Sequence, residues 1–197
     1  DLLDAGVTSL KIEGRLKDVS YVKNVTAAYR QKLDAIFARR KEYARASSGT
    51  CHFDFKPQLD KSFSRGFTHY FLQGRQREIS SFDTPKSLGE EMGTMKEQRG
   101  NYLTVAGLKP FHNGDGVCFL DEQGRLQGFR INRVDGNKLY PAGEVPRIKP
   151  RTCLYRNFDQ DFERVLARKS SERKIAINWE LSDTSFGFAL TATDEDD

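Results

Sequence analysis

Three charged side chains near the start of the chain, Lys11, Glu13 and Arg15, have the types and spacing that could do chemistry. Lys11 and Glu13 lie two residues apart, so an extended backbone places both on one face. An arginine can hold a carboxylate or phosphate with its planar guanidinium, and a glutamate can orient such a group or accept a proton. The three are therefore candidate catalytic residues. A solvated Lys11–Glu13 pair on an edge strand is the alternative explanation.

The segment that carries these residues has the pattern of a strand followed by a helix. Leu10 and Ile12 alternate with polar residues, which predicts a strand over residues 7–13 with one apolar face. Asp18 is expected to cap a helix over residues 19–40, where apolar residues recur every three or four positions. Such a unit is typical of a parallel α/β fold. In a TIM barrel, the carboxyl ends of the strands meet the substrate.

Two blocks of sequence resemble peptidase family U32, the collagenase-like proteins. The first is Ser-Leu-Lys-Ile-Glu-Gly-Arg over residues 9–15, followed by Tyr-Val at 21–22 and Tyr-Arg at 29–30. The second is Lys-Ser-Phe-Ser-Arg-Gly-Phe-Thr over residues 61–68, which is similar to the region beyond the barrel in longer members. Asp-Val-Ser at 18–20 replaces the family's usual Ser-Pro-Glu, a change that helix capping tolerates.

The resemblance extends over residues 2–155 and implies that the chain is an internal fragment of a longer protein. It implies that the fragment begins with the end of a TIM-like catalytic barrel, whose site Lys11, Glu13 and Arg15 would line. The longer members include a bacterial protein needed to hydroxylate a cytidine of large-subunit ribosomal RNA. Several members are similar to iron–sulfur proteins whose cysteines lie upstream. The resemblance thus allows a cluster in the parent protein and implies no cofactor in this fragment.

The segment after the predicted helix is basic and aromatic. Nine basic and three acidic residues lie between Arg39 and Arg77, although the whole chain carries a net charge of only +4. Basic side chains neutralise phosphates and aromatic faces stack bases, so this mixture favours contact with single-stranded RNA. Docking of a connector onto a neighbouring domain is the alternative. The candidate RNA-binding residues are Arg65, Phe67, Tyr70, Arg75 and Arg77.

Residues 86–158 have the pattern of short strands and turns. Ten of the sixteen glycines lie between Gly89 and Gly143, and Asn-Gly-Asp-Gly over residues 113–116 is typical of a turn. Asp115 in that sequence is interpreted as a turn residue whose carboxylate binds nearby backbone amides, rather than as a catalytic or metal-binding group. Strands are expected over residues 91–97, 102–106, 116–120, 126–134, 138–140 and 152–156. Their number and spacing predict a small closed barrel, similar to the second domain of elongation factor Tu.

The last part of the chain is expected to form a short helix and a hairpin. Asp159 or Asn157 could cap a helix that reaches about residue 169. Alternating apolar residues on both sides of a turn at 182–185 predict a hairpin with one apolar face, and Trp179 is interpreted as its core anchor. A lone hairpin is marginally stable, so this one is expected to pack on the barrel or to begin a further, truncated domain.

Cysteine usage and hydropathy indicate the compartment. Cys51, Cys118 and Cys153 are odd in number and lack Cys-x-x-Cys spacing, which favours neither a disulfide framework nor a zinc site. No apolar run approaches the length of a membrane span, and no metal-ligand spacing is found in the sequence. We therefore expect a cytoplasmic protein without a membrane contact or a metal site in this chain.

Together these patterns predict an α+β chain of five parts. They are the end of a TIM-like barrel, a basic aromatic connector, a small antiparallel β-barrel, a linker helix and the hairpin of a truncated domain, at residues 1–45, 46–85, 86–158, 159–173 and 174–197.

Three functions remain open at this point. The parent protein could hydroxylate RNA, ribosomal or transfer, with this fragment as an RNA-docking accessory. It could instead be a peptidase, as the family name states, with accessory domains that bind protein. The fragment could also be a purely structural module. Separated from the rest of a barrel, Lys11, Glu13 and Arg15 are expected to be inert, because no opposing wall would position a substrate.

Overall fold

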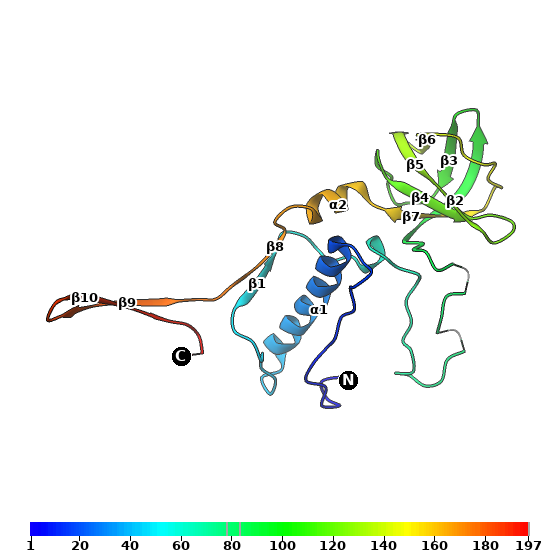
Figure 1. Ribbon diagram of the computed structural model, residues 1–197. Coiled ribbons are helices and arrows are strands. Elements are labelled where there is room, and N and C mark those ends of the chain that lie inside the picture. The colour runs from blue at the N-terminus through cyan, green and yellow to red at the C-terminus, as the bar shows by residue number, and fades with distance from the viewer. Residues whose placement is uncertain (78, 83, 197) are drawn as a thin grey trace.

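The computed structural model describes residues 1–77, 79–82 and 84–196. The chain has a mixed α+β fold in which every paired strand is antiparallel to its neighbour within the described residues. Figure 1 shows a barrel at one end of the molecule, helix α1 (Val19–Arg39) below it, and a hairpin that extends away from both. No helix among the described residues is long and apolar enough to cross a membrane.

Six strands form a closed barrel in the order β2-β3-β6-β5-β4-β7, which confirms the prediction of a small closed barrel. Ring closure pairs every strand on both sides and so leaves no exposed edge. The predicted strands agree with the observed ones to within about two residues at each end. The strands are β2 (Glu90–Arg99), β3 (Tyr102–Ala106), β4 (Gly116–Leu120), β5 (Leu126–Asp135), β6 (Lys138–Pro141) and β7 (Cys153–Phe158).

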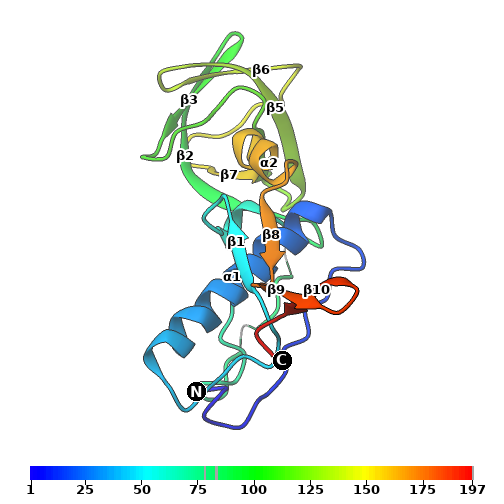
Figure 2. The ribbon, with the colours of Figure 1, turned by 90° about the vertical axis from the view of Figure 1, so that its left-hand side faces the viewer.

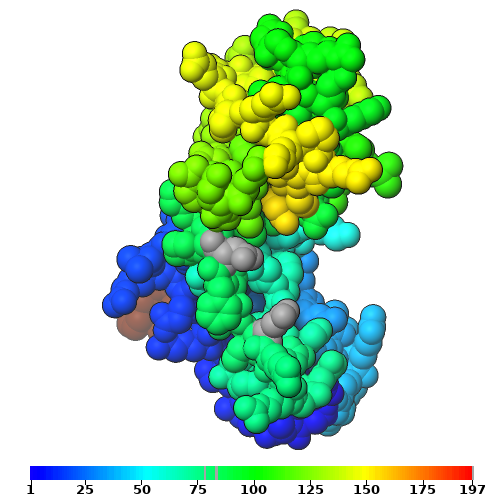
Figure 3. All heavy atoms as spheres, turned by 90° about the vertical axis from the view of Figure 1, so that its right-hand side faces the viewer, coloured from blue at the N-terminus to red at the C-terminus, as the bar shows by residue number. Residues whose placement is uncertain are grey.

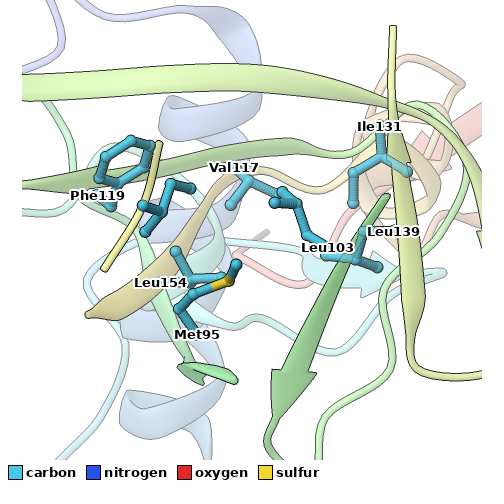
Figure 4. Close-up of a cluster of buried hydrophobic side chains, with 8 residues drawn as sticks. Met95, Leu103, Val117, Phe119, Ile131, Leu139 and Leu154 are labelled. Atoms are coloured by element: carbon cyan, nitrogen blue, oxygen red, sulfur yellow. The ribbon is translucent and has the colours of Figure 1, made fainter. Parts of the chain in front are cut away.

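The interior of the barrel is a continuous apolar core. Every strand contributes at least one side chain to it, and the loop before β7 adds Ile148. Figure 4 shows these side chains pointing toward one another from opposite walls. The core thus gives the barrel its own source of stability, since buried apolar area is the main favourable term in folding. Its buried members are Met95, Leu103, Val117, Phe119, Ile131, Leu139, Ile148 and Leu154.

Strand β2 bends around the barrel at a bulge that requires glycine. The pairing of β2 with β7 shifts register between Glu91 and Gly93. Gly93 has a φ of +132°, and a Cβ added there would lie 2.3 Å from the carbonyl oxygen of Ala106. Any other residue would therefore collide with the neighbouring backbone and occupy a conformation that L residues disfavour.

Helix α1 begins where the sequence predicts. The Asp18 carboxylate accepts a hydrogen bond of 2.7 Å from the backbone N–H of Tyr21, which makes it the N-cap. The helix ends at Arg39, one residue from the predicted end.

The prediction of a strand over residues 7–13 is wrong for this chain. The segment is unassigned backbone without a strand partner. A strand requires a neighbour to accept and donate its backbone hydrogen bonds, and no strand of the described residues pairs with this segment. Leu10 and Ile12 nevertheless line a groove with Leu33 and Phe37 of α1, together with Thr8 and Ser9.

A two-stranded sheet that the sequence analysis missed lies beside α1. Strand β1 (Thr50–Phe53) pairs with β8 (Ser171–Lys174), from Thr50 opposite Lys174 to Phe53 opposite Ser171. Figure 2 shows the two strands side by side along the helix. The expected linker helix is shorter than predicted: α2 (Gln160–Leu166) has Asp159 as its N-cap, and the chain then enters β8.

The C-terminal hairpin forms as predicted but packs differently. Strands β9 (Asn178–Thr184) and β10 (Gly187–Thr193) pair with each other and with no described strand besides. Trp179 is 65% exposed, so its interpretation as a core anchor is wrong. The hairpin extends away from the barrel (Figure 1), and its large apolar side chains are exposed.

Candidate functional site

The three candidate catalytic residues lie on the surface of the N-terminal segment. Lys11 Nζ and Glu13 Oε1 form an ion pair of 2.8 Å, with side chains 85% and 74% exposed. Arg15 is exposed as well. Because Ile12 faces α1, the polar face of the segment points outward, away from the helix. The ion pair is solvated, as the alternative explanation expects, although the segment that carries it is not a strand, and the role of the three residues in a barrel site stays a prediction.

A glycine holds this segment close to α1. A Cβ added at Gly14 would lie 2.8 Å from Cγ2 of Val22, so the backbone at Gly14 packs directly on the first turns of the helix. Val22 belongs to the Tyr-Val pair of the family pattern. The glycine and the helix thus fix where Glu13 and Arg15 emerge.

All five candidate RNA-binding residues are exposed. Arg65, Phe67 and Tyr70 lie near the middle of the connector, and Arg75 and Arg77 follow. Phe67 is 72% exposed and Tyr70 is 59% exposed. In Figure 3 the connector lies on the surface below the barrel. Their accessibility is what contact with a nucleic acid requires, while contact itself stays a prediction.

Two of the five, Arg65 and Phe67, lie in a groove between the connector and α1. The groove has a volume of about 770 Å³. Tyr21 and Tyr29 of α1 form part of its wall, and Phe63 of the connector lies with them. In the sequence, both tyrosines indicate only the helix and the family pattern. The pattern of a basic aromatic connector could not reveal that a helix more than 30 residues away supplies the other wall.

A buried asparagine fixes the groove. Asn24 of α1 is fully buried, and its Nδ2 donates to the Gln58 carbonyl at 2.6 Å and to Ser62 Oγ at 3.0 Å. Its Oδ1 accepts from the Gln58 N–H at 2.9 Å. These bonds join α1 to residues 58 and 62 of the connector. At the other side, Ser64 accepts backbone hydrogen bonds from Leu88 and Gly89, where the chain enters the barrel.

The sequence analysis also missed a buried network of charges at the base of the barrel. Arg156 of β7 is 4% exposed and lies at the centre. Its Nη2 donates to Glu90 at 2.5 Å and lies 3.2 Å from Asp159, and its Nη1 donates to Asp115 at 3.2 Å. Lys61 Nζ lies 2.7 Å from Asp159, and Lys109 Nζ lies 3.0 Å from Glu90. The network thus contains equal numbers of acidic and basic side chains, three of each.

This network explains the ionisation of its acids. Burial raises the pKa of Glu90, but hydrogen bonds from Arg156 and Lys109 outweigh it, and the net shift is downward. Burial likewise raises the pKa of Asp159, and the Lys61 ammonium and the Phe162 N–H lower it further than burial raises it. Both carboxylates are therefore ionised at neutral pH, and the neighbouring cations compensate their charge.

The turn interpretation of Asp115 is confirmed in part. Its carboxylate accepts hydrogen bonds of 2.9 Å from the backbone N–H of His112 and from that of Gln160. It is also completely buried against Arg156, which a turn sequence alone did not predict. The Asp115 side chain thus ties the barrel to the start of α2.

One group of residues has the geometry of metal ligands among those the structure describes. Ligand atoms of His112, Asp115 and Asp159 lie within 4.8 Å of one another. Arg156 and Lys61 already neutralise the two aspartates, at 3.2 Å or less. A divalent cation would be placed beside two fixed positive charges, so the group does not fit a metal centre.

The cysteines do not fit an iron–sulfur cluster, which requires several thiolates close together. Cys118 is buried in the barrel wall, where burial raises the pKa of its thiol to about 12. Cys153 lies on the neighbouring strand, and burial raises its pKa too. Cys51 belongs to β1, outside the barrel. None of the three belongs to a three-ligand group within the described part of the chain.

Comparison with known proteins bears on the family. Residues 1–81 match the model of peptidase family U32, which confirms the resemblance. The chain is 43% identical, over 99% of its length, to the 23S rRNA 5-hydroxycytidine C2501 synthase of Escherichia coli strain K12, of which it covers 31%. The tRNA hydroxylation protein P1 of Bacillus subtilis strain 168 is 32% identical over 72% of the chain, which covers 34% of that protein.

A further relative extends the same pattern. The tRNA hydroxylation protein P of Escherichia coli strain K12 is 28% identical over 76% of the chain, which covers 31% of that protein. The chain thus spans about a third of the length of the curated relatives it matches. Their names state RNA hydroxylation and not proteolysis. No solved structure shows a significant match to the chain.

Proposed function

We propose that the protein containing this chain hydroxylates a base of RNA and that the chain contributes part of the active-site wall together with RNA-docking surfaces. The observation that carries the proposal is the similarity to the ribosomal RNA hydroxycytidine synthase over 99% of the chain. The exposed basic and aromatic connector supports it, because such side chains suit phosphates and bases. The proposed location is the cytoplasm, where ribosomal and transfer RNA are accessible.

In this proposal the N-terminal segment lines the reaction site. Arg15 binds a carboxylate or phosphate group through its planar fork, and Glu13 orients that group or accepts a proton. Lys11 holds Glu13 through the ion pair of 2.8 Å. The outward polar face of the segment supports this arrangement, since the remaining wall would have to lie opposite it. Any iron–sulfur cluster of the parent protein would take its ligands from outside this chain.

The test of this function is nucleoside mass spectrometry of ribosomal and transfer RNA from a deletion strain. We expect one hydroxylated nucleoside to be absent and to return when the full-length gene is supplied. Complementation with Glu13→Gln or Arg15→Gln should restore it poorly, whereas Lys41→Gln, at an exposed position beyond α1, should restore it fully. An unchanged nucleoside profile in the deletion strain would reject RNA hydroxylation.

A peptidase is the second candidate function, and the family's description favours it. In that case the barrel and connector would bind a protein substrate. Purified full-length protein should then cleave gelatin or peptides, and Glu13→Gln should abolish cleavage. Absence of cleavage with and without added divalent metals, together with a lost nucleoside in the deletion strain, would decide in favour of RNA hydroxylation.

The small barrel is proposed to be an accessory module similar to the second domain of elongation factor Tu. The closed six-strand ring and the glycine-dependent bulge in β2 support this similarity. A barrel of this kind often lies beside RNA in the translation machinery. The connector and barrel together would then orient a folded RNA toward the N-terminal segment.

A further inference from the structure

The groove between α1 and the connector has aromatic side chains on both walls. Tyr21 and Tyr29 line it from α1, and Phe63 and Phe67 line it from the connector. Its volume of about 770 Å³ lies within the range usual for ligand sites. Tyr29 and Phe67 are 46% and 72% exposed, so large aromatic faces meet water here. Such faces would be covered by a planar ligand that stacks on them.

The polar groups of the groove suit a phosphate. Arg65 lines it together with the hydroxyl-bearing Ser64, Ser80 and Ser81, and none of its described lining residues is acidic. Lys17 Nζ lies 3.3 Å from the centroid of the Phe63 ring, which adds a second cation at the edge. The connector sequence from Lys61 to Arg77 contains four Lys or Arg residues and no Asp or Glu. The surface is therefore complementary to a polyanion.

We infer that this groove binds single-stranded RNA, with one or two bases stacked on the tyrosine and phenylalanine rings and the adjoining phosphate held by Arg65. The inference rests on the proposed function, since it names the surface by which the hydroxylase would hold an unpaired stretch of its RNA substrate. Stacking faces beside a basic rim are how proteins bind single strands with little sequence preference.

The groove is already organised for this ligand. Asn24 fixes α1 to the connector through three hydrogen bonds of 2.6–3.0 Å. Ser64 is fixed to the entrance of the barrel through hydrogen bonds from Leu88, Gly89 and Ser87. The two walls thus keep their separation without a ligand, which lowers the entropic cost of binding. A protein segment would have to be strongly acidic to match the same rim.

The first test measures RNA binding by fluorescence anisotropy. Full-length protein is titrated with a labelled single-stranded RNA of about 12 nucleotides, a length within the site sizes of single-strand binders. Tyr29→Leu and Phe67→Leu should each weaken binding about tenfold, because each removes a stacking face. Phe186→Leu is the matched control: this phenylalanine is fully exposed on the distant hairpin, and its substitution should leave the affinity unchanged.

The second test separates the phosphate contact from stacking. Arg65→Gln should weaken binding and reduce the slope of log affinity against log salt concentration by about 0.7, the value for one lost phosphate contact on a single strand. Arg147→Gln removes an exposed arginine on the barrel and is the matched control. The stacking variants should leave the salt slope unchanged.

Hydrogen exchange of the full-length protein completes the test. RNA should protect residues 63–68 and the first turns of α1. Normal RNA binding by the Tyr29, Phe67 and Arg65 variants would overturn the groove assignment. Protection of the groove in RNA-free protein would overturn it too, because another part of the protein would then occupy it. These results leave RNA hydroxylation standing if the deletion strain lacks the nucleoside, so the two proposals fail separately.

Discussion

At the scale of single residues, the molecule depends most on a buried arginine. Arg156 joins β7 to Glu90 of β2, to Asp115 before β4 and to the cap of α2. Removing one partner of such a network leaves the others as uncompensated buried charges. We therefore expect Arg156→Met to lower the free energy of unfolding by about 3–5 kcal/mol at pH 7. Arg164→Met, at an exposed pair with Asp161, should change it by less than about 0.5 kcal/mol.

The same network predicts how stability depends on pH. The folded-state pKa values of Glu90 and Asp159 lie below their ordinary values of 4.5 and 3.8. Their stabilising effect is therefore fully present above about pH 5 and is lost as the pH falls through the lowered folded values. In Arg156→Met the acids lose their cation and protonate more readily, so the stability gap to the wild type should narrow below pH 4.5. Urea unfolding of both proteins between pH 3 and 7 measures the difference in their free energies of unfolding. A difference that does not change with pH would contradict this explanation.

Two glycine-to-alanine substitutions test why the bulge in β2 requires glycine. Gly93→Ala places a Cβ 2.3 Å from a backbone oxygen at a φ of +132°, so it should cost more than about 2 kcal/mol. Gly136→Ala has a positive φ of +58° but meets no atom within 4 Å, and should cost about 1 kcal/mol. Thermal unfolding measures the loss of stability in each variant. Equal losses would show that only the positive φ of Gly93 matters, and not the close contact with the backbone of Ala106.

At the scale of elements, the attachment of α1 depends on Asn24. Asn24→Ala removes three hydrogen bonds and takes away the partner of the Gln58 N–H and of the buried Ser62 hydroxyl. We expect a loss of about 1–3 kcal/mol, together with faster amide exchange over residues 58–64. Asn101→Ala, at an exposed turn between β2 and β3, is the control and should leave that exchange unchanged.

The sequence predicted elements well where the information is local. The barrel strands follow from alternation and from turns such as Asn-Gly-Asp-Gly. The β3–β6, β4–β7 and β2–β7 pairings that close the ring join strands that are not consecutive, and the sequence did not predict them. The β1–β8 pairing was missed because its strands are short and lie about 120 residues apart. The segment over residues 7–13 failed for a different reason, since its pattern is that of a strand but no partner strand lies beside it.

Only part of the candidate site could be predicted from the sequence. The exposed connector residues follow from composition, and the Lys11–Glu13 pair follows from two-residue spacing. The tyrosines of α1 could not be assigned to a groove, because helical periodicity indicates a face and not what lies opposite it. The Arg156 network was invisible because its six charged groups are spread from Lys61 to Asp159.

At the scale of the whole molecule, the exposure of aromatic side chains divides the chain into parts that resist proteolysis and parts that are cleaved readily. The connector and the hairpin expose aromatic residues, among them Phe67, Phe82, Trp179 and Phe186. Chymotrypsin should therefore cut this chain first in those two regions and leave a fragment that contains the barrel and α2. Mass spectrometry of a brief digest would identify the fragments. First cuts within β2–β7 would contradict the description of the barrel as the stable unit.

The β1–β8 pairing has a consequence for how the molecule is assembled and how it can change. β1 pairs with β8, and the stretch of sequence between these two strands includes the whole barrel. The first and last strands of the barrel, β2 and β7, are also adjacent, with Glu90 opposite Arg156. The barrel is thus inserted in the sequence between β1 and β8. Because the entropic cost of closing a loop grows slowly with its length, the β1–β8 sheet can tolerate inserted segments of different length between its strands. Lineages could exchange, enlarge or lose the inserted unit while the helix and its two-stranded sheet remain unaltered.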